Sequence, residues 1–437
     1  MARLKVGLAE RVITPPVGVP LGGYAGRPGP SVGVHDDLRA RALVLESGGE
    51  RAAVVSLELL YPTPELVKAV KEEAEGRAGV PADSVLIAAV HTHSGPSVFG
   101  LDPCLERSYL DEYWSLLPGL VASAVVEAAG QLGEVSVRHG RGRLDGWTVN
   151  RRKPGLGPLD NEVCALLFEG AGGPVAVMVN FACHAVVLGH NNLLISADYP
   201  GAASRAVERL LGCSTLFLAG ACGDVNPLTP GTSLERVYDR SVGTFADVEE
   251  MGTAVACEAV KALLGSRRED EVELSTFRRE VKLSVQQVPE VGLGEVAALE
   301  EELRRALARG NETSASQLRF KLGVARWALE VARRLRERAP GGELTTEVQA
   351  LRLGSVAIVA LPGEPFVEVG LAIKSRSPAR LTMVAGYSND AIGYVPTDTA
   401  FDEGGYETAF PACVVGRGSA ERLVEAAVET VKRLFAS

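Results

Sequence analysis

The sequence predicts an α/β fold: a single catalytic domain over residues 1–437, in which a mixed, mostly parallel sheet is flanked by helices. Two observations predict it. Short apolar runs of strand length alternate along the chain with longer segments of helical spacing. No stretch rich in Pro, Gly or Ser interrupts this alternation to mark a domain boundary, and no internal repeat is visible in the sequence.

The apolar runs define the expected strands. Two pairs of runs are joined by short glycine-containing turns, at Ser47-Gly48-Gly49 and at 170–173, and these pairs are predicted to be hairpins. The predicted strands are 39–46, 51–59, 85–90, 163–168, 175–181, 215–219, 356–361 and 381–385. The predicted helices are 64–76, 111–131, 201–211, 365–376 and 420–435.

Residues 291–340 differ from the rest of the chain. Glu and Arg dominate there at helical spacing, and the pattern breaks near Gly310-Asn311. This predicts a charged, antiparallel helical hairpin that projects from the core as a solvated excursion. A lid over a site and a dimerisation arm are the alternatives, and a homo-oligomer that uses this surface is left open.

Composition excludes several classes of partner. The formal net charge is −10, so there is no basic field to attract nucleic acid. The N-terminus lacks the pattern of a signal peptide, and no apolar stretch is long enough to be a transmembrane segment. Seven cysteines are scattered singly, which is typical of a reducing compartment. We therefore expect a cytoplasmic protein that acts on a small molecule.

Candidate chemistry collects where predicted strands end. Five apolar runs are each followed by a short loop rich in polar or metal-binding residues. The five loops contain His91 to Pro96, His184, Gly223 to Pro227, Glu364, and Asn389-Asp390 with Tyr394 beyond. If the strands are mostly parallel, these loops converge at one edge of the sheet.

Four residues in these loops suggest a metal site. His91 and His93 are two apart, and such residues on an extended segment point to the same side. His184 alone is weak evidence, and Glu364 could instead cap the helix that Pro365 begins. Together, two histidines and a carboxylate form the ligand set of catalytic zinc sites, and the same set fits non-haem iron.

These stretches, taken in order, resemble the neutral, non-lysosomal ceramidase family, and the resemblance covers most of the chain. The matching stretches are Gly33-Val34-His35 with Leu38 to Ala42, His91 to Pro96, Asn150-Arg151, Phe181 to His184, Ser196 to Asp198, Gly223 to Pro227, Leu361 to Glu364, Gly393 to Thr397, and Tyr406-Glu407.

The resemblance implies a zinc ion bound by His91, His184, Glu364 and Tyr394. For Tyr394, the alternative is a phenol that only donates a hydrogen bond to the substrate. It also implies that His93 and Arg151 line the site and contact the scissile group.

Two departures from the family pattern stand out. Asn226 replaces the serine of Gly-Asp-Val-Ser-Pro, which excludes a covalent serine route but leaves Asn226 as a catalytic donor to an oxyanion. The family's immunoglobulin-like domain is not expected after the last predicted helix.

The predicted function is therefore that of a zinc-dependent hydrolase, in which metal-activated water cleaves the amide bond of a ceramide-like or other N-acyl substrate. Tyr394 and Arg151 are the expected oxyanion donors, and His93 the expected proton shuttle. Asp198 or Asp224 is expected to orient a histidine. A zinc esterase, a peptide or N-acyl amidase unrelated to lipids, a non-haem iron oxygenase and a non-catalytic metal-binding homologue are the alternatives.

Overall fold

The computed structural model describes residues 3–98, 107–289 and 292–436. Most of this chain is built from three units with the same order of elements: three strands, a helix, a fourth strand and a second helix. The first unit comprises β1 (Leu4–Val12), β3 (Arg39–Ser47), β4 (Glu50–Leu57), α1 (Pro64–Ala78), β5 (Val85–Ala89) and α2 (Arg107–Gly130). The second comprises β6 (Gly133–Arg143), β8 (Glu162–Gly170), β9 (Gly173–Phe181), α3 (Asp198–Leu211), β11 (Ser214–Ala219) and α4 (Phe245–Leu264). The third comprises β14 (Leu274–Ser284), β15 (Glu343–Leu353), β16 (Val356–Ala360), α7 (Val367–Arg376), β18 (Leu381–Ala385) and α9 (Ser419–Phe435).

The strands of each unit lie side by side in chain order, in the sequences β1-β3-β4-β5, β6-β8-β9-β11 and β14-β15-β16-β18. The units therefore repeat in topology although the sequence shows no repeat. Antiparallel pairing of β1 with β6, which sets Leu4 opposite Val135, joins the first two units into one sheet.

The prediction of a mixed sheet is confirmed, but the expectation that it is mostly parallel is wrong. Within the three units only the β4–β5, β9–β11 and β16–β18 pairs are parallel. Each parallel pair is connected through a helix, whereas β3–β4, β8–β9 and β15–β16 are joined by turns too short for a crossover. A short turn thus enforces antiparallel pairing, but the long connections between β1 and β3, β6 and β8, and β14 and β15 also join antiparallel strands.

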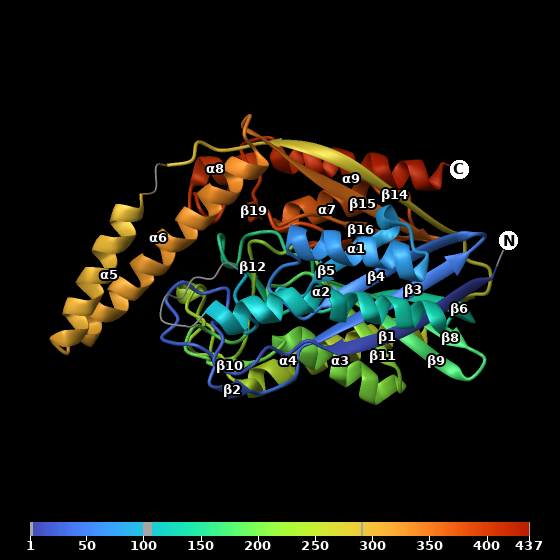
Figure 1. Cartoon of the computed structure of the whole chain (residues 1–437). Coiled ribbons are helices and arrows are strands. Elements are labelled where there is room, and N and C mark those ends of the chain that lie inside the picture. Colours follow the sequence, from blue (N-terminus) through green and yellow to red (C-terminus); the bar gives the residue numbers. More distant parts are fainter. Residues whose placement is uncertain (1–2, 99–106, 290–291, 437) are drawn as a thin grey trace.

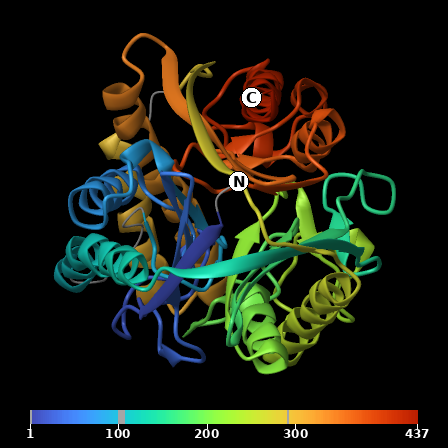
Figure 2. The same ribbon diagram turned by 90° about the vertical axis from the view of Figure 1, so that its right-hand side faces the viewer.

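The sheet portions of the three units pack around a common core, and the helices lie outside them. Figure 2 shows the units as three groups around a centre. The central core contains one face of each sheet, with Leu43, Leu166 and Ile358 among its residues. Each unit also has an outer core between its sheet and its own helices. Because β5, β16 and β18 are buried along their whole length, they read as continuous apolar runs.

Most predicted elements are found within a few residues of their expected bounds. The main omissions are β1, β6, β14, β15 and α4. The strand β14 is poor in buried residues, and its charged side chains, such as Arg278 and Glu280, hide its strand character. The helix α4 begins with a capping box in which Thr244 and Asp247 bond each other's backbone N–H.

Shorter strands and a short α-helix lie between the main elements along the chain. They are β2 (Gly33–Val34), β7 (Thr148–Asn150), β10 (Leu194–Ile195), β12 (Val225–Pro227), β13 (Arg268–Glu269), β17 (Glu364–Pro365), β19 (Tyr394–Val395) and α8 (Asp398–Glu403). Among the described helices, none is both long and apolar enough to cross a bilayer.

The predicted helical hairpin is confirmed. It consists of α5 (Leu293–Ala308) and α6 (Glu312–Arg338), inserted between β14 and β15 of the third unit; its predicted first residue, Val291, lies outside the described residues. Figure 1 shows the hairpin projecting from the three-unit body. The remote half of the hairpin is the expected excursion, but part of α6 packs closely on the body, where Gly323 has no room for a Cβ atom beside the carbonyl of Ala25.

Candidate functional site

The parallel strands of the three units end at the same side of the molecule, so the predicted loops do converge. His91 and His93 follow β5, His184 follows β9 and Glu364 follows β16. All four side chains are buried; His184 is fully shielded from solvent and Glu364 is 3% exposed. The loops converge although the sheets are not mostly parallel. Each strand that carries a site residue pairs in parallel with the strand to which a helical crossover connects it.

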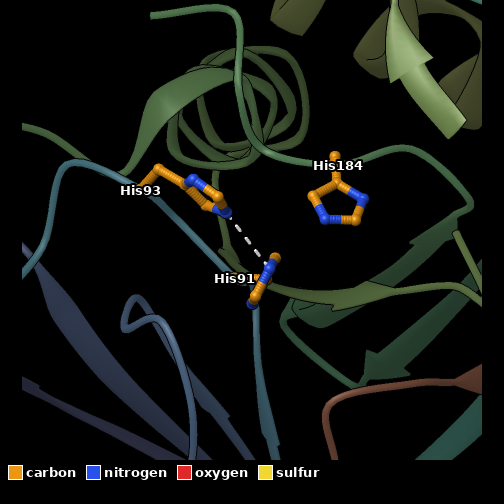
Figure 3. Close-up of side chains that lie close together, drawn as sticks. All are labelled: His91, His93 and His184. Atoms are coloured by element: carbon orange, nitrogen blue, oxygen red, sulfur yellow. Dashed lines mark hydrogen bonds between the residues drawn. The ribbon is translucent and has the colours of Figure 1, made fainter. Parts of the chain in front are cut away.

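The prediction that His91 and His93 share one cavity is consistent with their positions, but not for the expected reason. The backbone of His91 is left-handed, with φ of 65°, so the segment is not extended there. The turn brings the rings to a centroid separation of 4.9 Å and the two Nε2 atoms to 3.2 Å. Figure 3 shows His91, His93 and His184 gathered around one point.

Backbone carbonyls fix the orientation of two of these imidazoles. His91 Nδ1 lies 2.8 Å from the carbonyl oxygen of Leu60, and His184 Nδ1 lies 2.6 Å from that of Cys222. A carbonyl oxygen only accepts, so each Nδ1 carries the proton and donates it. The Nε2 lone pair of each ring is therefore free to bind a metal ion.

The donor atoms have the spacing that a zinc-sized cation needs. Glu364 Oε2 lies 3.3 Å from His91 Nε2 and 3.1 Å from His184 Nε2. Ligands at about 2.0–2.1 Å from a tetrahedral zinc ion lie about 3.3–3.4 Å from each other. One nitrogen each from His91, His93 and His184 also lies within 4.8 Å of the other two. This group could hold a metal ion, with His93 as a further candidate ligand.

Burial and mutual contact control the protonation of this cluster. Burial lowers the pKa of His184 to about 4 and that of His93 well below its usual range. Burial alone would raise the pKa of Glu364, but the adjacent His91 and His184 outweigh it and hold that pKa well below the ordinary value. Neutral imidazoles beside an ionised carboxylate are the forms that bind divalent metals.

Arg151 lies beside this cluster with its guanidinium fully engaged. Its Nη2 donates to Tyr394 Oη at 2.9 Å, its Nη1 to Asn226 Oδ1 at 3.0 Å and its Nε to Glu407 Oε1 at 3.0 Å. The side chain is 5% exposed, and that of Glu407 is fully buried. A rigid, desolvated cation is therefore presented next to the candidate ligands.

Tyr394 and Asn226 are both brought to the site. Tyr394 lies directly opposite Glu364 in the β17–β19 pair, and its hydroxyl also bonds that of Tyr406 at 2.9 Å. Metal ligation by Tyr394 stays a prediction. The Nδ2 atom of Asn226 donates to the carbonyl of Val237, so this amide has protein partners at both ends. A donor role for Asn226 likewise stays a prediction, whereas its hydrogen bond from Arg151 is observed in the structure.

The expectation that Asp198 or Asp224 orients a histidine is wrong. Asp198 accepts from the backbone N–H groups of Val187, Leu188 and Tyr199. Asp224 accepts from Asn150 and from the backbone of Val367. Both carboxylates hold loop backbone in place, and His91 and His184 are oriented instead by the backbone carbonyls of Leu60 and Cys222.

A cavity of about 590 Å³ opens over the cluster. Its floor is polar and includes His91, His93, Arg151, Asn226, Glu364 and Tyr394. Its walls are largely apolar or aromatic and include Tyr24, Val186, Tyr238, Phe320, Val324, Trp327, Tyr406, Phe410, Pro411 and Ala412. Three of these, Phe320, Val324 and Trp327, belong to α6, so the hairpin forms one wall of the cavity.

Sequence reasoning missed several residues of this site. Tyr61, which follows β4, touches both His91 and Glu364. Tyr387 stacks on His91 with centroids 4.1 Å apart. The signal that could have found Tyr61 is the one used for the other loops, because it too follows a buried apolar strand.

The chain is similar in sequence and fold to several known proteins. The model of the family described as neutral/alkaline non-lysosomal ceramidase, N-terminal, matches residues 4–236. The neutral ceramidase of Mycobacterium tuberculosis is 25% identical over 472 residues, which cover 88% of this chain and 70% of that one. Neutral ceramidase 1 of Arabidopsis thaliana is 28% identical over 46% of this chain and 29% of its own length. The crystal structure of neutral ceramidase from Pseudomonas aeruginosa has the same fold, with a TM-score of 0.76 and 20% identity over 99% of this chain and 75% of that one.

Proposed function

The chain belongs to the neutral/alkaline non-lysosomal ceramidase family, and from this we propose that it is a zinc-dependent hydrolase that cleaves the amide bond of a ceramide-like N-acyl substrate. The observation that carries the proposal is the convergence of His91, His184 and Glu364, at ligand spacing, beneath a largely apolar cavity. Hydrolysis needs an activated water, a donor to the developing oxyanion and a route for one proton to the leaving amine.

The metal would be held by His91 Nε2, His184 Nε2 and Glu364 Oε2, with Tyr394 as the fourth protein group, which leaves His93 outside the ligand set. When bound, zinc supplies a water of lowered pKa and polarises the substrate carbonyl. The protein's part is to keep His184 neutral, since burial lowers its pKa to about 4, and to keep Glu364 ionised, since the adjacent His91 and His184 hold the pKa of that carboxyl well below its ordinary value.

Arg151 and Tyr394 would meet the oxyanion. The two side chains already bond each other at 2.9 Å, and both line the cavity. Asn226 and Glu407 hold the guanidinium in place, so little reorganisation is needed as negative charge develops on the substrate oxygen.

His93 would transfer the proton. It faces the cavity, its Nε2 lies 3.2 Å from that of His91, and its buried Nδ1 has no hydrogen-bond partner within the described chain. An imidazole with an uncommitted nitrogen at this position can take a proton from the attacking water and give it to the amine nitrogen.

The cavity supports an acyl-chain substrate. Its walls are mainly hydrocarbon and aromatic, and its polar lining consists chiefly of the residues around the candidate ligands together with Arg240. An acyl chain would bury apolar surface along Phe320, Val324 and Trp327 while its amide reaches the polar floor. A small, polar amide would leave these walls uncovered.

The test is hydrolysis by the purified protein after chelation and metal add-back. We expect release of a fatty acid from an N-acyl sphingoid substrate, loss of activity on chelation and recovery with zinc. Substrates that carry the same acyl chain as an ester or on an amino acid distinguish the esterase and N-acyl amino acid alternatives. Recovery with ferrous iron and oxygen consumption, or full activity in metal-free protein, would contradict the proposal.

A further inference from the structure

The three units place one side chain each at equivalent points of the site. Tyr61 lies four residues after the end of β4, His184 three residues after β9 and Glu364 four residues after β16. Each of these strands is the third of its unit and precedes the helical crossover. Two of the three positions hold candidate metal ligands, and the third holds Tyr61.

Tyr61 bonds the carboxylate that faces the histidines. Its hydroxyl hydrogen-bonds Glu364 Oε1, while Glu364 Oε2 faces His91 and His184. An ionised carboxylate only accepts, so the phenol is the donor. Oε1 of Glu364 thus accepts from Tyr61, whereas Oε2 faces the two histidines.

The segment that carries Tyr61 is rigid and also supports His91. The carbonyl of the preceding residue, Leu60, accepts from His91 Nδ1, and the Tyr61 ring packs edge-on against the His91 ring with centroids 4.9 Å apart. Immediately after Tyr61, Thr63 caps α1 and Pro64 begins it. Tyr61 itself is 8% exposed, so its ring has little freedom to swing away.

We propose that Tyr61 is a positioning residue for the metal centre: its hydroxyl holds Glu364 so that Oε2 alone is offered to the cation. This inference rests on the proposed metal site. Without the hydroxyl, Oε1 is left buried without this donor, and the carboxylate can rotate toward two-oxygen binding or toward other donors. Partners that orient ligands in this way typically contribute about 10–100-fold to metal affinity.

The experiment compares zinc affinity in the full-length wild type, Tyr61→Phe and Tyr113→Phe by competition with a chromogenic chelator. Tyr113 is the matched control, because it is also 8% exposed and its hydroxyl donates to the carbonyl of Ile13, away from the site. We expect about 10–100-fold weaker zinc binding for Tyr61→Phe and wild-type affinity for Tyr113→Phe. The visible spectrum of the cobalt-substituted protein should change for Tyr61→Phe alone.

A double-mutant cycle with Glu364→Gln separates positioning from general damage to the fold. Removing the hydroxyl should weaken zinc binding much less when Glu364 is already replaced. Equal affinity of Tyr61→Phe and the wild type, or an equal loss in both Glu364 backgrounds, would overturn the inference. A wild type that binds no zinc would instead refute the proposed metal site, and a wild type that binds zinc without hydrolysis would refute only the proposed activity.

Discussion

The candidate metal centre and the helical hairpin lie against the same cavity but are built in opposite ways. The centre is buried and is assembled from all three units, with His91 from the first, His184 from the second and Glu364 from the third. The wall formed by α6 is contributed by one insertion, and Phe320 on that wall is 56% exposed. Under the proposed function, this comparison predicts that bond cleavage depends on long-range packing of the whole body, whereas selection among substrates depends on the peripheral hairpin.

The largest effect is expected from Glu364→Gln, which breaks the centre and leaves the hairpin intact. The substitution keeps the shape of the side chain but removes the charge that His91 and His184 face. Zinc binding and hydrolysis should fall by more than the roughly 10–100-fold typical of a partner outside the ligand set. Atomic emission measures the metal content, and turnover of an N-acyl substrate measures hydrolysis. Glu425→Gln, exposed on α9, is the control, and full zinc retention by Glu364→Gln would contradict the assignment.

Arg151→Lys should separate metal binding from catalysis within the centre. Lysine keeps the charge beside Glu407 but cannot reproduce the fork that reaches Tyr394 and Asn226 together. We expect kcat to fall about 100-fold, as for loss of one oxyanion donor, with zinc affinity unchanged. Steady-state kinetics and zinc competition measure the two quantities. A parallel fall of both would mean that Arg151 supports the ligands and not the oxyanion.

Phe320→Ala should alter the wall and leave the centre intact. Loss of its apolar contact should lower kcat/KM for long-chain substrates by about 10-fold, since burial of such a side chain is worth roughly 1.5–3 kcal/mol and Phe320 is only partly covered. Short-chain substrates should be cleaved at the wild-type rate. Leu307→Ala is the control, because this residue of α5 is similarly exposed and does not line the cavity. An equal loss for short and long chains would refute the separation of the two regions.

The smallest effect is expected from a helix cap that lines neither the centre nor the wall formed by α6. Thr244→Ala removes the capping box of α4 and should lower the free energy of unfolding by about 1 kcal/mol, with zinc affinity and kcat unchanged. Chemical denaturation measures the stability. Thr253→Ala, an exposed site within the same helix, should be nearly neutral. A loss of activity in Thr244→Ala would show that the centre is more sensitive to remote packing than the comparison implies.

Local pattern was enough to locate the loops that bear the chemistry. His91, His184 and Glu364 each follow an apolar run, and the alternation of apolar and polar segments is a property of neighbouring residues. The helical hairpin was predicted for the same reason, since its charge pattern repeats along the segment itself.

What lies between distant segments could not be predicted in this way. The direction of most strand pairs, the threefold repetition of topology and the backbone carbonyls of Leu60 and Cys222 that orient two imidazoles all depend on contacts between residues far apart in the chain. Tyr61 follows a buried apolar strand as the other site residues do, but its contact with Glu364 joins residues far apart in the chain.

By itself, then, the sequence determined which segments form most of the helices and strands and which side chains can bind a metal, because hydrophobic period and side-chain chemistry act locally. Only the tertiary structure decided which of those side chains meet, which oxygen of Glu364 faces the histidines and which face of α6 lines the cavity. These are set by the packing of the three units around one core, where burial of apolar surface fixes relations that no single segment encodes.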